Sequence, residues 1–486
     1  MILLPPNTSV LLSLTACEMK TTFGRNKSLR AKNIQYKMLT ADDTYRLPVF
    51  SIPNKMKLKI LFLSALTILI ATTSMAQDLA DEVDLFMGVH GNSNCVIGPQ
   101  LPHGSVNPSP DTPKGGQNGY DENDKIRGFS QLHVSGIGWS RYGQILLSPQ
   151  NGFSAKETGH DSPKANEIAK PYCYAATLTR YGIRTELSPT HHGVFYRFTF
   201  NKPNNNNILL DLRHNIPQDI VPIVKGTFNG GEINYNEKQR LISGYGIYAG
   251  GFGSKQPYRV YFAMKIDDPD ATVTITNNDT KALYAKIGVK AKTVNASIAI
   301  SMSSVRNATK YLEVELEDHS FEQVCDAARK LWNRTLGKIV FSGANKEQRQ
   351  LFYTSLYHSY VMPRLRTGDN PGWKSNEPHL DDHYCVWDTW RTKYPLMTLL
   401  NPSFTAATVR SFIDRYKHDG LCTATYTASM EWPENQGGDD VDNIIADAIL
   451  KGVKGFDYKQ AYEVMKNNAL TQRDSTYRRL GWIPGE

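Results

Sequence analysis

Two patterns of apolar and polar residues divide the chain. From residue 83 to about residue 304, short runs that alternate apolar with polar side chains are separated by Gly, Asn, Asp and Pro, as at residues 193–200 and 258–264. Alternation of this kind predicts half-buried antiparallel strands. Because such a sheet buries one face, two sheets packed together are the natural solution. The pattern therefore predicts an antiparallel β-sandwich over residues 77–304.

The apolar period changes to that of an α-helix near residue 321. Apolar side chains recur at helical spacing over several later segments, which are residues 322–332, 347–363, 402–416, 441–451 and a stretch opened by Asp457. Successive amphipathic helices, joined by loops rich in His, Trp and acidic residues, favour an (α/α)6 toroid, and a simple helical bundle is the alternative. Since about five helices are visible, the predicted fold is multidomain β plus α, with a β-sandwich followed by an incomplete toroid. Residues 305–345 are expected to form a helical linker, and residues 346–486 the first part of the toroid.

A secretory signal peptide is predicted over residues 56–76. Lys57 and Lys59 precede an apolar run over residues 60–71, and a small-residue cleavage site ends at Ala76. The run is shorter than the ~20 residues that span a bilayer, so we expect no stable membrane span after cleavage and a periplasmic or secreted protein. An export signal belongs at the start of a chain, which makes residues 1–55 an expected non-native extension.

The formal charge of +8 comes mainly from the N-terminus. Residues 1–55 hold eight Lys or Arg against three acids, and the signal peptide adds two lysines, so the predicted mature chain carries only +1. That near-neutral balance gives no electrostatic case for nucleic acid. The five cysteines of the mature chain are widely scattered and contain no CxxC spacing, which disfavours a disulfide-dense scaffold and a thiolate zinc site and leaves room for an occasional bridge.

Two glycine-rich segments are candidate binding loops. Residues 84–94 present His90, and residues 128–143 present His133 and Trp139 among glycines that let a backbone approach a ligand closely. An aromatic ring beside polar groups suits a pyranose, whose C–H face packs on the ring while its hydroxyls need hydrogen-bond partners. The alternatives are a plain connector with a solvated histidine and a tryptophan that belongs to the core.

The segment over residues 383–395 carries the densest chemistry. Trp387 and Trp390 bracket Asp388, and Arg391 follows one helical turn later. A helix would place Asp388 and Arg391 on one face, where they could bind sugar hydroxyls or form a structural ion pair.

An acidic loop over residues 431–443 collects five carboxylates near Trp432. Oxygen ligands at this density could hold calcium, and two of the carboxylates could act as an acid and a base. The spacing differs from that of an EF-hand, and a solvated acidic face with helix caps is the alternative.

Five segments of the chain resemble, in order, the signatures of glycoside hydrolase family 92. One of them reads Trp-Asp-Thr-Trp-Arg at residues 387–391, and the full set comprises residues 84–91, 128–138, 352–358, 387–391 and 445–456. Together they extend the resemblance over essentially residues 83–486.

The resemblance implies a calcium-dependent exo-acting α-mannosidase that releases terminal mannose from glycans with inversion. It also implies a β-sandwich paired with an (α/α)6 toroid, with the site between them. The residues expected to bind the sugar lie in both parts and are Phe86, Gly88, His90, His133, Trp139, Trp387, Asp388 and Arg391.

One departure from the family limits what the resemblance implies. The family's catalytic Glu and Asp, and most of its calcium ligands, lie C-terminal to the segment that corresponds to residues 480–484. We therefore expect a fragment that lacks its acid, base and metal ligands, and no catalytic or metal residue is named. An apolar patch around Phe412 and Ile413 is expected to be left exposed.

Two alternative functions remain open from the sequence. One is a glycan-binding remnant without turnover. The other is a different α/α-toroid enzyme, such as a polysaccharide lyase that uses Glu431 with Asp439 and Asp440. The mannose linkage and the oligomeric state are not determined by the sequence.

Overall fold

The computed structural model describes residues 78–89, 94–216, 225–253, 255–278, 282–340, 343–384, 386–432, 440–472 and 475–482. The predicted extension, the predicted signal peptide and His90 lie outside these residues. The chain divides into two compact units. The larger one, which comprises residues 79–336 and 346–486, contains every helix and strand described below. The other comprises residues 1–78 and 337–345, of which only residue 78 and two short stretches are described.

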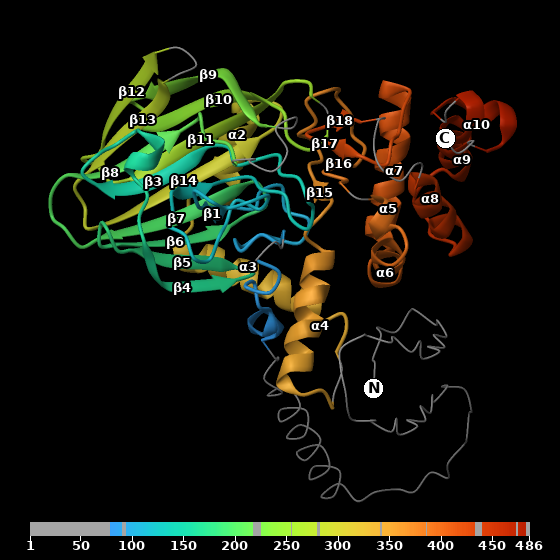
Figure 1. Cartoon of the computed structure of the whole chain (residues 1–486), viewed down its shortest axis with the longest axis horizontal. Helices are drawn as coiled ribbons and strands as arrows, with labels where there is room; N and C mark the ends of the chain where they lie inside the picture. Colours follow the sequence, from blue (N-terminus) through green and yellow to red (C-terminus); the bar gives the residue numbers. More distant parts are fainter. Residues whose placement is uncertain are drawn as a thin grey trace, which may run out of the picture. The chain divides into compact units, whose positions relative to one another are not determined.

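Two antiparallel sheets form the first part of the larger unit (Figure 1). The six-stranded sheet has the order β1 (Ser109–Asp111), β2 (Gly128–Ser130), β3 (Leu146–Asn151), β8 (Asn206–Asp211), β13 (Ala282–Val289) and β12 (Thr272–Asn278). The eight-stranded sheet has the order β4 (Lys164–Lys170), β5 (Cys173–Leu178), β6 (Ile183–Pro189), β7 (Gly193–Phe200), β14 (Thr293–Ser301), β11 (Tyr258–Asp267), β10 (Leu241–Ala249) and β9 (Thr227–Asn236). Short 3-10 turns, η1 (Leu79–Glu82) and η2 (Glu157–Gly159), lie outside the sheets.

The alternation that predicted the strands sorts their side chains between the core and the outer face. In β6, Ile183 and Leu187 are buried, whereas Glu186 is half-buried and pairs across the strands with Arg197 of β7 at 2.8 Å. The inner faces of the two sheets meet where Phe129 contacts aromatic rings of the opposite sheet. The antiparallel β-structure of the N-terminal part is thus confirmed.

Two helices cover the outer face of the eight-stranded sheet. They are α2 (Val305–Glu315), capped by the Ser304 side chain, and α3 (Phe321–Leu336). Leu312 and Phe321 pack there against Phe195 of the sheet in one buried cluster. The predicted linker region therefore contributes to the core of the sandwich part.

The remaining chain is helical with two small hairpins. Its helices are α4 (Lys346–Ser359), α5 (Val386–Thr389), α6 (Lys393–Leu400), α7 (Pro402–Asp419), α8 (Asp440–Leu450), α9 (Tyr458–Asn467), the π-helical turn η5 (Asn468–Gln472) and α10 (Ser475–Leu480). The hairpins pair β15 (Arg364–Leu365) with β16 (Leu380–Asp381), and β17 (Tyr426–Thr427) with β18 (Met430–Glu431). A helical part thus follows the β-structure, and its closure into a toroid stays a prediction. None of the described helices is long and apolar enough to cross a membrane.

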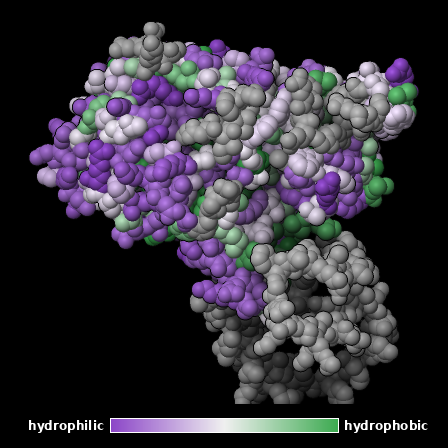
Figure 2. Space-filling view, viewed as in Figure 1, coloured by the Kyte–Doolittle hydropathy of each residue, from purple (hydrophilic) through white to green (hydrophobic). Residues whose placement is uncertain are grey.

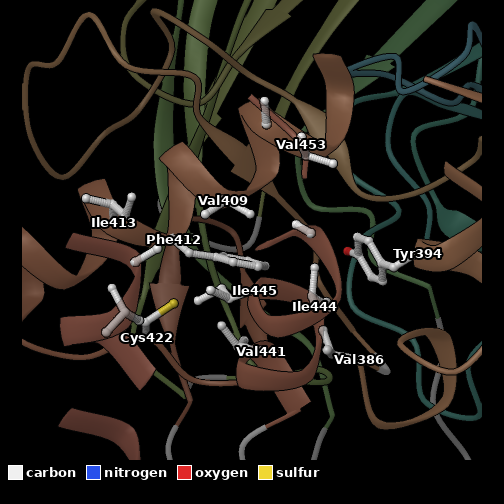
Figure 3. Close-up of a cluster of buried hydrophobic side chains, with 14 of the residues drawn as sticks. Val386, Tyr394, Val409, Phe412, Ile413, Cys422, Val441, Ile444, Ile445 and Val453 are labelled. Atoms are coloured by element: carbon white, nitrogen blue, oxygen red, sulfur yellow. The ribbon is translucent and has the colours of Figure 1, made fainter. Parts of the chain in front are cut away.

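The expectation that Phe412 and Ile413 would be left exposed is wrong. Both residues are buried, because α8 and α9 lie against α7 and supply the apolar neighbours (Figure 3). That cluster includes Val409, Val441, Ile444, Ile445, Ala461 and Val464. Exposed apolar side chains occur later in the chain, at Leu450, Leu470 and Trp482. In the space-filling view, hydrophilic residues dominate the visible face of the sandwich (Figure 2).

Candidate functional site

A cavity of about 210 Å³ opens between loops of the sandwich and the segments that flank α5. The sandwich contributes Cys95 and residues 135–137. The helical part contributes residue 358 at the end of α4, residues 361–363 after it, and residues 382–384, 386, 389, 393 and 394. Two parts of the chain that are far apart in sequence therefore form one hollow.

The two glycine-rich loops predicted as binding loops meet at this cavity. The Gly136 N–H donates to the carbonyl of Asn94 at 2.8 Å, and the Cys95 N–H donates to the carbonyl of Gly88 at 3.0 Å. Gly88 has a φ of +87°, and a Cβ there would lie 2.7 Å from the Cys95 Sγ. Only glycine fits this position without strain. Gly88 thus sets the path of the loop that brings Cys95 to the cavity wall.

Phe86 lies in the same loop and is half-buried. The Phe86 N–H donates a hydrogen bond to the Asp84 carboxylate at 3.0 Å. Asp84 is in turn tied to α4, where its N–H donates to Thr354 Oγ1 at 2.9 Å. The predicted contact between Phe86 and a sugar stays a prediction.

A buried ionic network that the sequence did not reveal borders the cavity. Asp382 pairs with Arg364 at 2.9 Å and with Arg366 at 3.2 Å, and it accepts a hydrogen bond from the Tyr142 hydroxyl at 2.6 Å. Arg366 also pairs with Asp381. Although burial opposes ionisation, the two guanidinium groups hold the pKa of Asp382 below its ordinary value. The sequence analysis missed this network because Arg364 comes next to Asp381 only when β15 pairs with β16.

Three nitrogen atoms of the cavity wall are buried with no hydrogen-bond partner among the described residues. They are Lys393 Nζ, His358 Nε2 and His383 Nε2. Burial lowers the pKa of Lys393 to about 7 and that of His358 to about 4, and burial also lowers the pKa of His383. Because buried polar atoms in folded proteins are normally paired, these three atoms can form hydrogen bonds with polar groups that enter the cavity.

The predicted sugar-binding residues in and just after α5 do not line this cavity themselves, although Val386 and Thr389 of α5 do. Trp387 is half-buried, whereas Asp388 and Arg391 are exposed, and the Arg391 guanidinium lies 5.4 Å from the centre of the Trp390 ring. Within the described contacts Asp388 and Arg391 form no ion pair with each other. The structural ion pair considered from the sequence is therefore not formed here, and both charged groups face solvent next to Thr389 of the cavity wall.

Trp139 belongs to an aromatic group that joins the sandwich to the helical part. Its ring lies 5.7 Å from that of Phe252, which contacts Trp432 at 5.1 Å and Tyr384 at 5.8 Å. Trp139 is half-buried, and its neighbours Gly136 and Ile137 line the cavity. The ring thus stands near the cavity with part of its surface exposed.

His133 is placed inside the sandwich. Its side chain is fully buried, with Nε2 2.8 Å from Asp111 Oδ1 and Nδ1 2.9 Å from the carbonyl of Asn107. Burial opposes ionisation of Asp111, yet His133 and His214 lower the pKa of that carboxyl. Both ring nitrogens of His133 are occupied, so the geometry gives this residue a structural part, and its predicted contact with a sugar is not supported by an open face.

The first carboxylate of the acidic loop, that of Glu431, already accepts hydrogen bonds within the protein. Glu431 accepts two hydrogen bonds at 2.7 Å from the buried guanidinium of Arg415 and a third from Thr423 Oγ1. Residues 433–439, including Asp439, lie outside the described residues. In the part of the chain that the structure describes, no group of three or more His, Cys, Asp or Glu side chains could hold a metal ion.

Comparisons with known proteins agree with this arrangement. Residues 82–312 match the glycosyl hydrolase family 92 N-terminal domain, and residues 307–486 match the glycosyl hydrolase family 92 catalytic domain. The fold is similar to that of a family GH92 α-mannosidase from Bacteroides thetaiotaomicron in complex with mannoimidazole, with a TM-score of 0.74 and 25% identity over 84% of this chain and 58% of the other. A family GH92 inverting mannosidase from the same organism matches with a TM-score of 0.69 and 24% identity over 84% of this chain and 58% of the other.

A curated relative is also similar to this chain. It is an uncharacterized secreted glycosidase of Arthroderma benhamiae, 24% identical over an alignment of 463 residues that covers 84% of this chain and 56% of the relative. The chain thus spans somewhat more than half the length of the relatives that it matches.

Proposed function

The chain belongs to glycosyl hydrolase family 92. On that premise we propose that it acts as an exported α-mannosidase that releases terminal mannose from glycans by inverting hydrolysis. The observation that carries the proposal is the cavity between the two parts of the chain. Its wall holds three buried nitrogen atoms that have no hydrogen-bond partner among the described residues, and α5, which carries Trp387 and Asp388, contributes Val386 and Thr389 to it. The mannosidase relatives and the secreted relative support the substrate class and the export.

The residues around the cavity suit the recognition of a sugar. A pyranose offers an apolar C–H face, which packs on rings such as Trp387 or Trp139, and hydroxyl groups, which need donors and acceptors. Arg391 can donate two parallel hydrogen bonds, and Asp388 can accept from neighbouring hydroxyls. In this proposal the rings orient the sugar and the two charged groups fix which hydroxyls face them.

Inverting hydrolysis requires two carboxyl groups roughly 6.5–9.5 Å apart, one to protonate the leaving oxygen and one to activate water. The carboxylate in the cavity wall, Asp382, is held ionised by Arg364 and Arg366 and is committed to that network. It therefore suits neither protonation nor proton abstraction. We assign the acid and the base to no described residue.

We include calcium dependence in the proposal because the resemblance to the family implies it. Asp381, Asp382 and Glu431 are unsuited to hold the ion, because a buried arginine pairs with each of them. Adding and removing calcium in the assay below tests this part of the proposal independently.

The direct test is mannose release by the purified chain from an α-linked mannose disaccharide, with calcium or with a chelator. Calcium-dependent release with inverted anomeric configuration, followed by NMR, supports the whole proposal. Binding of mannose without release supports the alternative of a glycan-binding protein without turnover. Unsaturated uronate products from an acidic polysaccharide would instead support a lyase.

Substitution of the charged pair tests the site itself. We expect Asp388→Asn and Arg391→Met each to weaken mannose binding about 10-fold or more, because each removes a charge-assisted hydrogen bond worth about 1.5–3 kcal/mol. Calorimetric titration with mannose is the measurement. Asp447→Asn in α8 and Arg306→Met in α2 are matched controls that should bind normally. Unchanged affinity in both site variants would remove Asp388 and Arg391 from the proposed site.

A further inference from the structure

Two cysteines meet where α3 crosses the eight-stranded sheet. Two sets of contacts hold one face of α3 against the β part, one near the start of the helix and one two turns later. Near the start of the helix, Glu322 pairs with Arg197 of β7. Two turns later, Arg329 pairs with Asp81 at 2.5 Å and lies 5.4 Å from the centre of the Tyr172 ring.

Cys325 lies on the same face of α3, between these two anchors. Positions 322, 325 and 329 are separated by three and four residues, which places them in one row on a helix. Cys173 directly follows Tyr172, the residue that Arg329 covers, and it begins β5. The position of Cys325 in this row therefore places its side chain close to Cys173.

The two thiols contact each other. The Cys173 and Cys325 side chains are hydrogen-bonded, and both residues are free cysteines that are half-buried. Cys325 also packs against the apolar cluster that holds α3 on the sheet. A free thiol is only weakly polar. The pair differs in this contact from Cys95 and Cys422, which have no thiol partner among the described residues.

We infer that Cys173 and Cys325 form a disulfide when the chain enters an oxidising compartment, and that this bond ties β5 to α3. Disulfides persist in secreted and periplasmic proteins and are rare where thiols are kept reduced. The bond would close a loop from residue 173 to residue 325, long enough to restrict the unfolded chain strongly.

The reaction is ordinary thiol–disulfide exchange with a small disulfide such as oxidised glutathione. The Cys325 thiolate attacks one glutathione sulfur and expels the other as a thiolate, which takes up a proton. The Cys173 thiolate then attacks the Cys325 sulfur and expels the second glutathione thiolate. Two electrons pass from the cysteine pair to glutathione disulfide, and the two cysteine protons end on two glutathione thiols.

The hydrogen bond favours this order of events. It lowers the pKa of Cys325 and raises that of Cys173, so Cys325 is the more readily ionised thiol. Half-burial leaves the pair open to a small oxidant while it keeps the two sulfur atoms together.

The test is disulfide mapping of the purified full chain, first reduced and then equilibrated in glutathione buffers of increasing oxidation. We expect a mass loss of about 2 Da, since two hydrogens leave, and a cross-linked peptide that contains Cys173 and Cys325. The oxidised chain should melt roughly 3–6 °C higher than the reduced chain, and a reductant should reverse the rise.

Variants separate the proposed pair from other cysteines. Cys173→Ser and Cys325→Ser should each abolish the cross-link and the rise in Tm, whereas Cys422→Ala should keep both. A cross-link that survives in Cys325→Ser, or glutathione adducts on Cys173 and Cys325 without a bond between them, would overturn the inference. Differential alkylation of the unmodified chain gives the same answer if a serine variant fails to fold.

Discussion

Lys393 carries its ammonium group to the wall of the cavity, where the structure describes no acceptor for it. The Nζ atom is buried against the rings of Tyr394 and Phe404, at 4.1 and 5.7 Å from their centres. Burial lowers its pKa to about 7, so near neutral pH the group is poised between the charged and the neutral form. Lys393 is therefore a buried cation of the cavity wall that contacts two aromatic rings and has no hydrogen-bond acceptor among the described residues.

The low pKa of Lys393 predicts a specific dependence of stability on pH. An unfolded lysine has a pKa of about 10.4, so between pH 7 and 10.4 the unfolded state binds more protons than the folded state, and the free energy of unfolding rises with pH. Below pH 7 the full cost of burying the charge is present. We expect Lys393→Met to be more stable at pH 7 and to lose a slope of up to about 1.4 kcal/mol per pH unit.

Urea unfolding of Lys393→Met and of the exposed control Lys310→Met, each from pH 7 to pH 10, measures that slope. Parallel curves for the two variants would show that Lys393 does not titrate in this range.

Gly88 gives a second prediction for a single residue. Gly88→Ala should destabilise the protein by about 1–3 kcal/mol, because the positive φ strains an L-residue and the new Cβ meets the Cys95 sulfur. Gly138→Ala is the matched control, since no atom lies within 4 Å of its added Cβ. Thermal unfolding compares the two variants, and equal Tm values would contradict the argument.

At the scale of elements, the local signals for helix ends were largely correct. α7 begins at Pro402, as predicted, and continues to Asp419, three residues beyond the predicted end, before Gly420 with its φ of +68°. Asn401 precedes α7 but its side chain makes no capping hydrogen bond. Asp457 does cap α9, where its carboxylate accepts from the Lys459 and Gln460 N–H groups. The sequence thus predicts where a capping residue lies, whereas the path of the chain before the helix decides whether its side chain forms the capping hydrogen bond.

The cap of α9 predicts a measurable effect. Asp457→Ala should lower the free energy of unfolding by about 1 kcal/mol, because two backbone N–H groups lose their acceptor. Asp447→Ala in α8 is the control, since it removes only an exposed pair with Lys451 and should cost less than about 0.5 kcal/mol. Urea denaturation of both variants gives the comparison, and an equal loss would argue against the cap.

At the scale of the whole molecule, a buried charge network links the sandwich to the helical part. Tyr142 comes from the sandwich, whereas Arg364, Arg366, Asp381 and Asp382 come from the hairpin region after α4. Further bonds run from Arg364 to the carbonyl of Ser105. Charges buried this deeply are costly unless each has a partner, so the network holds only in the assembled fold.

Removal of one arginine from the network should be severe. We expect Arg366→Met to lower the free energy of unfolding by about 3–5 kcal/mol, because Asp381 loses its described ion-pair partner while both carboxylates stay buried. Arg410→Met is the control, since its half-exposed pair with Glu377 is worth at most about 1 kcal/mol. Chemical denaturation separates the outcomes, and similar losses in the two variants would contradict the role of the network.

The sequence by itself determined the type of the longer strands and helices that it predicted, the order of a β part and a helical part, and the family. These depend on local properties, since period two or 3.6, turn residues and short motifs are read within a few neighbouring positions. The same locality explains why Phe412 and Ile413 were misjudged: their covering partners come from α8 and α9, over 25 residues further along the chain.

Only the tertiary structure decided which distant residues meet. It buried His133 beside Asp111, joined Tyr142 to Asp382, placed Lys393 in a cavity wall with no described hydrogen-bond acceptor and brought Cys325 to Cys173. The energy of a buried charge or thiol depends on the atoms around it, and those atoms come from distant segments, as where Arg366 donates to Ser105, 261 residues away along the chain. No local pattern encodes that surrounding, because it exists only once the sheets and helices have packed together.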